Sequence, residues 1–501
     1  MTLKPIDIIK NPTLTVYQQF IELAKLAENQ DTTIPLSDDY IEAVKEGAIC
    51  DLNEGAAPFR PRYLIPDFEL LMQKGCEFLG LPVPTDLQEA TSYLLIFYRH
   101  ITSGSTYPPY LGNIDTLLEP FIKDEASAYE TIKLFLLMIA KTMPDSFVHA
   151  NIGPYDTRAG RMILKATEEL ALEIPNLTLK YDPEKTSDEF ANLCIRCMMK
   201  TAKPSFANDR MFRADLGDNY GIASCYNGFM IKGGAYTMNR IRLSDVAKKA
   251  SDIDDFFDRV LPHYTKTMID NINRRIHFEV EEAAFFKTNF MVKEGFLVRE
   301  NFIGMFGLVG LAECCNILLG ITDKTKGFGF NQEADKLGEK ILQEIVKLTK
   351  ENPLDYCEAY HGIAQLHAQV GIDSDGLDCS PGIRIPIGAE PPVAMQLNHS
   401  THYQKYFPTG CGDVYKFDET WYNHPEALLD ILKGAFEKGV RYFSGYEEGG
   451  DLVRVTGYLV KRSEIEKYRR GETILNSSTA LGYGAAENGH ALERKVNHEG
   501  D

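Results

Sequence analysis

The sequence predicts an α/β protein in which helices surround a barrel of strands. Helical periodicity runs through much of the first 200 residues, whereas short apolar runs such as SFVHANIGP at 146–154 are typical of strands. A further extended run, DLVRVTGYLV at 451–460, holds Gly457. Cys225 lies near the middle of the chain, with 224 residues before it and Gly457 a further 232 positions on. We therefore expect two halves of a barrel to meet at this cysteine.

Composition narrows the class of protein. The chain has 501 residues, 44% hydrophobic and 25% charged, which is an ordinary globular mixture. A formal net charge of −19 argues against a nucleic acid or an anionic membrane as partner. No apolar run approaches the roughly 18 residues that span a bilayer, and MTLKPIDIIKNPTL lacks the features of a signal peptide. We expect a cytoplasmic enzyme whose ten cysteines are thiols.

Amphipathic helical stretches dominate the N-terminal part. We expect residues 1–100 to be largely helical, 103–113 to form a loop, and helices to follow within 114–142, 157–173, 187–202 and 251–286. The third of these, 187–202, holds Cys194 and Cys197, which we interpret as core thiols because a single CxxC on an apolar helix is weak evidence for metal or redox chemistry. The predicted strand at 146–154 carries His149 and Asn151, which are either site residues or polar residues of the core.

Gly457 stands in the run RVTGY, between a β-branched residue and an aromatic one. Glycine weakens a strand, so one interpretation is a bulge or a tight turn. The other is chemical: a glycine α-carbon can hold an unpaired electron, because no side chain crowds the planar radical and both adjoining peptide groups delocalise it. This second interpretation requires a partner site elsewhere in the chain.

Cys225 provides that partner. The β-like run YGIA leads into Ser224 and Cys225, and the sequence GGAYTMNRIRLSDVAK follows. Together with RVTGY, this order resembles the glycyl radical enzyme superfamily, which includes pyruvate formate-lyase and the class III ribonucleotide reductases; the chain is most similar to the YjjI-type group. The resemblance implies a ten-stranded β/α barrel of two antiparallel five-stranded halves at 1–430 and a glycyl radical domain at 431–501.

The same resemblance implies the chemistry. Gly457 would store the radical, Cys225 would form a thiyl radical, and a separate radical S-adenosylmethionine activase would oxidise Gly457 under anaerobic conditions. We expect no bound metal or organic cofactor, a small polar metabolite as substrate, and a homodimer as one form of assembly. Cleavage, elimination and rearrangement stay open as reactions. The alternative from another class is a noncatalytic barrel that binds a metabolite or a partner.

Departures from the better-known members bear on the reaction. Ser224 stands where pyruvate formate-lyases have a first cysteine, and Asn227 stands where eliminating members have a glutamate. No cysteine follows Cys411, whereas class III reductases carry a C-terminal cysteine zinc site. Formate-lyase and ribonucleotide reductase activities are therefore the less favoured expectations.

Further candidates follow from position. Arg240 aligns, with a one-residue gap, with the arginine that binds substrate carboxylate in pyruvate formate-lyase, and a structural ion pair is its alternative. Glu313 precedes Cys314 and Cys315 at a predicted strand-to-helix junction, where we expect inert thiols, and Glu390 follows the strand-like IRIPI. We expect 409–423 to be a loop and 461–501 a mobile tail with Gly482, Gly484 and Gly489. The candidates for substrate binding are Arg240, Asn227, Ser224, Glu390, Glu313 and His149.

Overall fold

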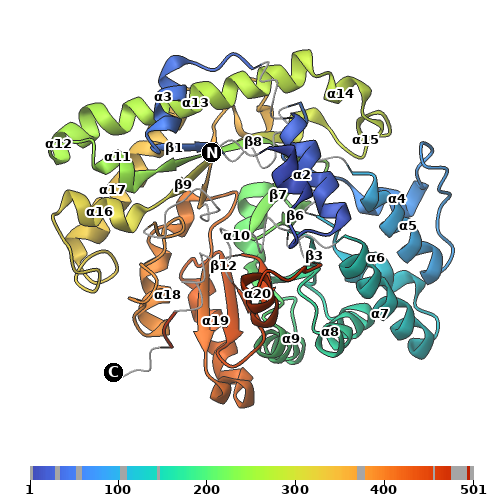
Figure 1. Ribbon diagram of the computed structural model, residues 1–501. Helices are drawn as coiled ribbons and strands as arrows, with labels where there is room; N and C mark the ends of the chain where they lie inside the picture. Colours follow the sequence, from blue (N-terminus) through green and yellow to red (C-terminus); the bar gives the residue numbers. More distant parts are fainter. Residues whose placement is uncertain are drawn as a thin grey trace.

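The computed structural model describes residues 4–28, 34–51, 59–101, 110–143, 147–368, 379–454, 457–475 and 494–496. Two five-stranded sheets form the centre of this described part, and helices pack around them (Figure 1). The prediction of an α/β fold with ten strands divided into two halves is confirmed.

The first sheet has the order β1-β8-β9-β10, and β2 also pairs with β8. Its strands β8, β9 and β10 are parallel, while β1 and β2 run antiparallel to β8. The glycines of FIGMFGLVG let β9 pack closely: a Cβ on Gly307 would lie 2.8 Å from the Asn239 carbonyl oxygen. The bounds of these strands are Ile49–Asp51 (β1), Tyr63–Ile65 (β2), Gly233–Arg242 (β8), Phe302–Val309 (β9) and Gln365–Ala368 (β10).

The second sheet has the order β11-β12-β5-β4-β3 and is parallel except between β12 and β5. Every residue of β3, β4 and β5 is buried, as expected of parallel strands covered on both faces. The two sheets meet where the Ala368 amide of β10 donates to the Gly410 carbonyl, just before β11 (3.0 Å). The bounds are His149–Ile152 (β3), Asn176–Tyr181 (β4), Ser205–Asn208 (β5), Asp413–Phe417 (β11) and Tyr442–Glu447 (β12).

Two hairpins carry the residues singled out by the sequence. Strands β6 (Tyr220–Ala223) and β7 (Asn227–Met230) form the first, with Cys225 in its turn. It contacts β3 of one sheet and β8 of the other, and Figure 1 shows it near the middle of the molecule. The second hairpin, β13 (Leu452–Arg454) and β14 (Leu459–Lys461), carries Gly457 between its strands.

Side-chain caps begin many of the surrounding helices. Asp86, Asp124, Ser187 and Asn331, for example, each accept from a backbone amide in the first turn of their helix, which satisfies a donor that the helix itself leaves free. The helices are α1 (Pro5–Ile9), α2 (Val16–Glu28), α3 (Asp38–Lys45), α4 (Phe68–Lys74), α5 (Leu87–Arg99), α6 (Ile114–Leu118), α7 (Glu125–Thr142), α8 (Arg158–Leu170), α9 (Asp188–Thr201), α10 (Asp209–Leu216), α11 (Leu243–Ala247), α12 (Ile253–Asp255), α13 (Leu261–His277), α14 (Phe285–Thr288), α15 (Phe290–Lys293), α16 (Leu311–Leu318), α17 (Gln332–Glu351), α18 (Val393–Thr401), α19 (Pro425–Glu437) and α20 (Arg462–Arg469). Short 3₁₀ and π segments lie at 119–121, 256–260, 278–282, 299–301, 358–360, 404–406 and 419–423.

The structure corrects four of the sequence predictions. The run IRIPI before Glu390 is not a strand, and the expected loop at 409–423 contains β11. Strands β1 and β2 interrupt the N-terminal helical region, and α20 occupies the beginning of the expected tail. Gly482, Gly484 and Gly489 lie outside the described residues, and the predicted boundary at 430 falls inside α19.

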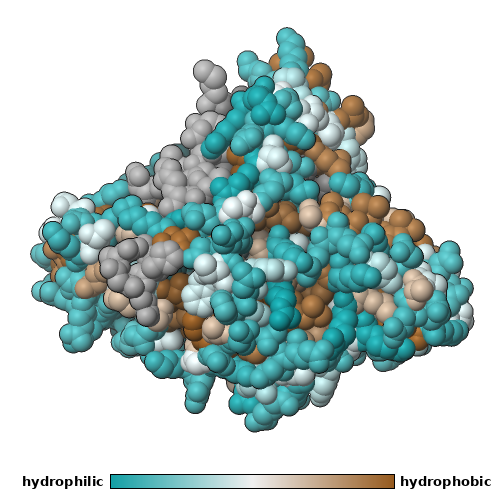
Figure 2. All heavy atoms as spheres, turned by 90° about the horizontal axis from the view of Figure 1, so that it is seen from below, coloured by the Kyte–Doolittle hydropathy of each residue, from teal (hydrophilic) through white to brown (hydrophobic). Residues whose placement is uncertain are grey.

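The face of the molecule drawn in Figure 2 has fewer hydrophobic than hydrophilic residues. Figure 2 shows a face that is mainly hydrophilic, with hydrophobic residues in separate patches. Among the described residues, no helix is long and apolar enough to cross a membrane.

Candidate active site

Gly457 and Cys225 are in contact inside the molecule. A Cβ built on Gly457 would lie 2.0 Å from the Cys225 Cβ and 2.6 Å from its Sγ. Since a carbon–carbon bond is about 1.5 Å long, the Sγ lies at most about 4.1 Å from the Gly457 Cα. Gly457 is buried and Cys225 is 8% exposed. Only glycine fits at position 457, and its α-carbon faces a thiol shielded from solvent.

The turn that presents Cys225 is short and strained. Ala223 pairs with Asn227, so Ser224, Cys225 and Tyr226 alone connect the two strands. Ser224 has φ of 59°, a left-handed conformation that is unfavourable for most residues, and its hydroxyl donates to the Cys225 Sγ (3.8 Å). The phenol of Tyr226 donates to the Ala368 carbonyl at the end of β10 (2.5 Å). These contacts hold the cysteine at a fixed position.

Three side chains from strands of the second sheet form hydrogen bonds to the backbone along β6, where the backbone of a neighbouring strand would otherwise pair. Lys180 donates to the Tyr220 carbonyl (2.6 Å), and the His149 Nδ1 lies 2.6 Å from the Ser224 carbonyl. Between them, the Asn151 amide donates to the Ile222 carbonyl and accepts from its N–H, both at 2.8 Å. The carbonyls of Tyr220 and Ile222 point the same way because carbonyl direction alternates along a strand, and the Ser224 carbonyl follows them in the turn. We call Lys180, Asn151 and His149 the side-chain ladder.

His149 is a neutral member of this ladder. Burial lowers the pKa of His149 to about 3. Because the Ser224 carbonyl can only accept, Nδ1 carries the proton, and the other ring nitrogen accepts from the Thr178 hydroxyl (2.8 Å). Both ring nitrogens therefore have protein partners. Thr178 also contacts the Tyr442 hydroxyl (2.6 Å), which lies 2.9 Å from the Cys225 carbonyl.

Two donors hold the Gly457 carbonyl. The Asn176 side chain donates at 3.0 Å and Arg454 Nη1 donates at 3.1 Å. Arg454 is completely buried, and burial lowers its pKa to about 10. The Arg454 Nε donates to the Ala202 carbonyl (2.8 Å), and its Nη2 donates to the Asn176 Oδ1 (3.1 Å). The backbone carbonyl of Arg454 accepts from Arg494 (2.9 Å). This arrangement fixes the peptide plane next to the Gly457 α-carbon.

The chain matches known proteins over almost its whole length. The family model described as "Glycyl radical enzyme YjjI-like" matches residues 14–497. The chain belongs to this family. An uncharacterised protein of Haemophilus influenzae is 44% identical over 99% of this chain and 98% of its own length. The uncharacterised protein YjjI of Escherichia coli is 38% identical over 98% of this chain and 96% of its own length.

Solved structures share the fold at low identity. An anaerobic ribonucleotide reductase has a TM-score of 0.70 at 14% identity, over 91% of this chain and 84% of its own length. The B12-independent glycerol dehydratase of Clostridium butyricum, in a glycerol-bound form, has a TM-score of 0.62 at 11% identity, over 95% of this chain and 83% of its own. The YjjI-like chain thus has the fold of glycyl radical enzymes.

The other predicted residues lie either in the Cys225 hairpin or in other parts of the fold. Ser224 and Asn227 lie in the Cys225 hairpin; Asn227 is 2% exposed, and its Oδ1 has no hydrogen-bond partner among the described residues. Arg240 lies within β8, buried, opposite Gly307 of β9. Glu313 accepts from Ser380 (2.5 Å). Burial raises the pKa of Glu390, which accepts from the amides of Gly388 (2.8 Å) and Lys495 (3.4 Å). Their roles toward a substrate stay predictions.

Four further thiols of this YjjI-like protein are enclosed in the core. Cys194 and Cys197 are buried on α9, and Cys314 and Cys315 are buried on α16. Burial raises the pKa of all four thiols, which keeps them protonated. Among the residues that can be described, no group of three or more His, Cys, Asp or Glu has the arrangement of a metal site.

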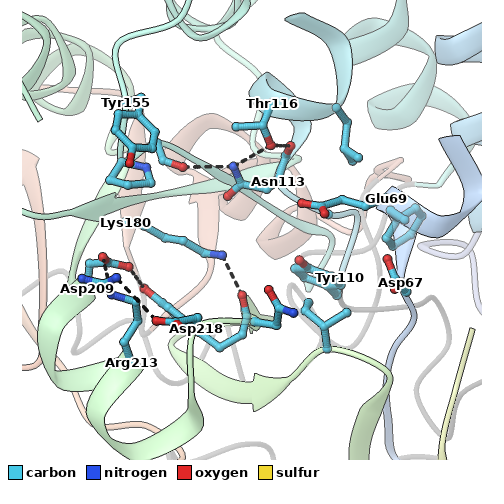
Figure 3. Close-up of a pocket in the computed structure, with 18 of the residues that line it drawn as sticks. Asp67, Glu69, Tyr110, Asn113, Thr116, Tyr155, Lys180, Asp209, Arg213 and Asp218 are labelled. Atoms are coloured by element: carbon cyan, nitrogen blue, oxygen red, sulfur yellow. Dashed lines mark hydrogen bonds and ion pairs between the residues drawn. The ribbon is translucent and has the colours of Figure 1, made fainter. Parts of the chain in front are cut away.

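A cavity of about 360 Å³ lies at the base of the Cys225 hairpin (Figure 3). Asn219, Tyr220 and Ile231 line it, whereas Cys225 and Gly457 do not. The Lys180 ammonium lies 4.4 Å from the centre of the Tyr220 ring, and burial lowers the pKa of Lys180 to about 8. The charged residues lining this cavity are Asp67, Glu69, Lys180, Lys185, Asp209, Arg213 and Asp218.

Sequence reasoning missed several residues around Gly457 and Cys225. Asn176, Thr178 and Tyr442 come from β4 and β12 and reach the site only through the pairing of distant strands. Polar residues alternating along NLTLKY at 176–181 were an available signal, because such residues are rare in a fully buried strand. Arg454 was visible as the first residue of RVTGY.

Proposed function

We propose that Gly457 stores a radical and that Cys225 carries it to the substrate. The contact between the Gly457 α-carbon and the Cys225 Sγ supports this proposal, because hydrogen transfer needs the reacting atoms close together and aligned. In the first step, the glycyl radical takes the hydrogen atom of the Cys225 thiol. The S–H bond breaks homolytically, a C–H bond forms at Gly457, and a thiyl radical remains on sulfur.

In the second step, the thiyl radical takes a hydrogen atom from a carbon of a small polar metabolite, which becomes a substrate radical. The S–H bond is close in strength to an activated C–H bond, so the transfer runs in both directions. After rearrangement or bond cleavage, the product radical takes the hydrogen back and the thiyl radical returns to Gly457. Burial of both residues limits the access of water and oxygen to the intermediates.

A radical S-adenosylmethionine activase would make the first radical by removing one α-hydrogen of Gly457. Cys225 shields this carbon in the present structure, so the Gly457 hairpin has to move before an external enzyme reaches it. The donors to the Gly457 carbonyl, Asn176 and Arg454, would withdraw electron density from the radical and stabilise its planar form.

The test is activation under strict anaerobiosis with a competent activase, S-adenosylmethionine and a reductant. We expect a doublet in electron paramagnetic resonance (EPR), followed on exposure to air by cleavage of the chain at Gly457. Gly445→Ala, at another close-packed glycine, is the matched control and should keep the signal if the variant folds. Absence of any signal with an activase shown to be active on its own partner would contradict the proposal and favour a noncatalytic barrel.

A further inference from the structure

Arg384 is a buried arginine that the protein uses only in part. Its exposure is 5%, its Nε donates to the Gly412 carbonyl (2.9 Å), and the same nitrogen lies 3.6 Å from the Asp413 Oδ1. Among the described residues, neither Nη1 nor Nη2 has a hydrogen-bond partner. A buried guanidinium with unmatched N–H groups is costly, so two such groups on one side chain indicate a partner that is not part of the fold.

The position of Arg384 connects it to the Cys225 turn. Gly412, which accepts from its Nε, packs against Tyr226 and Tyr442: a Cβ there would lie 3.2 Å and 3.0 Å from ring carbons of these residues. Tyr226 follows Cys225 in the chain, and the Tyr442 hydroxyl contacts the Cys225 carbonyl. Burial raises the pKa of Tyr226, an effect that the charge of Arg384 opposes. Burial lowers the pKa of Arg454, and Arg384 adds to that lowering.

The nearby acid does not use the free end of Arg384. Asp413 accepts from the Gln396 side chain through Oδ2 (2.7 Å) and from the Val414 amide through Oδ1 (2.8 Å), and its Oδ1 lies 3.6 Å from the Nε of Arg384. The two terminal nitrogens remain together at the end of the planar fork. Such a fork matches the two oxygens of a carboxylate in a bidentate pair, which is the strongest arrangement that arginine makes with an anion.

We propose that Arg384 binds a carboxylate group of the substrate and that the substrate is therefore a small carboxylic acid. The inference rests on the proposed radical function, because it names the substrate class of the same site. A carboxylate held by Nη1 and Nη2 would place the adjoining carbon chain beside the Cys225 turn. Arg384 is then a substrate-binding residue that selects acids over neutral polyols and amides.

Alkylation of Cys225 by two reagents of similar size tests this selection without a known substrate. Iodoacetate carries a carboxylate, and iodoacetamide is its neutral amide. Because both react with the thiolate, the thiol pKa affects both rates equally and does not change their ratio. With glutathione in the same anaerobic tube as reference, wild-type protein should prefer iodoacetate at Cys225 by about 10-fold or more. Peptide mass spectrometry after brief labelling gives the ratio.

Variants assign the preference to Arg384. Arg384→Gln should reduce the ratio to that of glutathione, and Arg384→Lys, which keeps the charge but loses the fork, should give an intermediate value. Arg299→Gln removes an arginine that pairs with Glu358 and should keep the wild-type ratio. In wild-type protein, which needs no folding control, acetate should protect Cys225 more than acetamide at the same concentration.

An unchanged ratio in Arg384→Gln, or equal protection by acetate and acetamide, would overturn the inference. So would a Cys225 that neither reagent reaches, because a site closed to a two-carbon acid cannot bind an acid substrate. The assay uses protein that has not been activated. Failure to form a radical would therefore refute the proposed function alone, whereas a radical with no acid preference would refute only the role of Arg384.

Discussion

Cysteine is placed inside this molecule in two different ways, at the Cys225 turn and at the Cys314–Cys315 pair. Both places are buried, and each lies close to a glycine. At Cys315, the nearby Gly338 belongs to a helix, and the position of its Cβ is 3.4 Å from the Sγ and 2.7 Å from Phe328. At Cys225, the glycine lies in a hairpin turn, and its Cβ position overlaps the cysteine itself.

The difference shows that burial alone does not make a thiol a candidate for radical chemistry. Cys314 and Cys315 sit in a strand-to-helix junction packed with apolar side chains, and desolvation raises the pKa of both. Cys225 instead lies at the end of a hairpin fixed by the side-chain ladder and touches an α-carbon whose peptide is held by two donors. A polar framework around an apolar contact therefore distinguishes the candidate site.

The largest expected effect concerns hydrogen exchange in the activated protein. In D₂O, the EPR doublet of the Gly457 radical should collapse to a single line, because the Cys225 thiol takes deuterium from solvent and passes it to the α-carbon. Cys225→Ser should slow this collapse by on the order of 10³-fold or more, since an O–H bond is too strong to replace S–H. Cys315→Ser should behave as wild type. Equal collapse in Cys225→Ser would remove the distinction between the two cysteine sites.

The next effect is on stability in acid, through His149. Its pKa is about 3 in the folded protein and near 6.5 when unfolded, so the unfolded state binds the extra proton between these values. The free energy of unfolding should fall by about 1.4 kcal/mol for each pH unit below 6.5 because of this residue. The free energy of unfolding, measured with urea at pH values from 8 to 4, should depend less steeply on pH in His149→Gln than in wild type.

His277 provides the control of opposite sign. Its hydrogen bonds to Asp355 and Glu281 raise its pKa, so it stabilises the fold at low pH and loses this contribution as the pH rises through the folded pKa. His277→Gln should therefore remove a gain in stability that wild type shows as the pH falls through the folded pKa towards 6.5, above the pH range in which His149 acts. If the free energy of unfolding depended on pH in the same way in both variants, neither histidine would govern that dependence.

Gly457→Ala should cost about 1–3 kcal/mol of stability, as overpacking of a tight core does, and should abolish the EPR signal. Thermal unfolding should show the loss, and adding Cys225→Gly should restore much of it, because the overlapping atoms belong to Cys225. Gly434→Ala in α19 has nothing within 4 Å and should leave the unfolding temperature equal or higher. A Gly457→Ala protein as stable as wild type would contradict the described contact.

The smallest effect separates positioning from simple stabilisation. Asn151→Ala removes both hydrogen bonds to Ile222 and should cost about 1–3 kcal/mol. Asn316→Ala removes a bond to the Phe328 amide near Cys315 and should cost a similar amount. Only Asn151→Ala should also slow the collapse of the doublet in D₂O. Equal collapse rates in the two variants would show that the ladder stabilises the fold without positioning Cys225.

The sequence alone was sufficient to select residues whose type the proposed chemistry requires. It was insufficient to select residues that come together only when distant parts of the chain fold against each other. The contact between Gly457 and Cys225 could be predicted because a radical relay would need a glycine and a cysteine side by side, and the hairpin around Cys225 followed from short β-like runs. Strand β11 was mistaken for a loop because glycines and an aspartate surround it, although its residues are mostly buried between other elements. Arg384 was read only as part of a strand, since nothing local reveals that its terminal nitrogens lack partners.

The contact of Arg494 with the Arg454 carbonyl has a consequence for biosynthesis. Arg494 lies 40 residues after Arg454 in the chain, so this hydrogen bond forms only after that later segment has left the ribosome. Until then, the Arg454 carbonyl in the Gly457 hairpin lacks this donor.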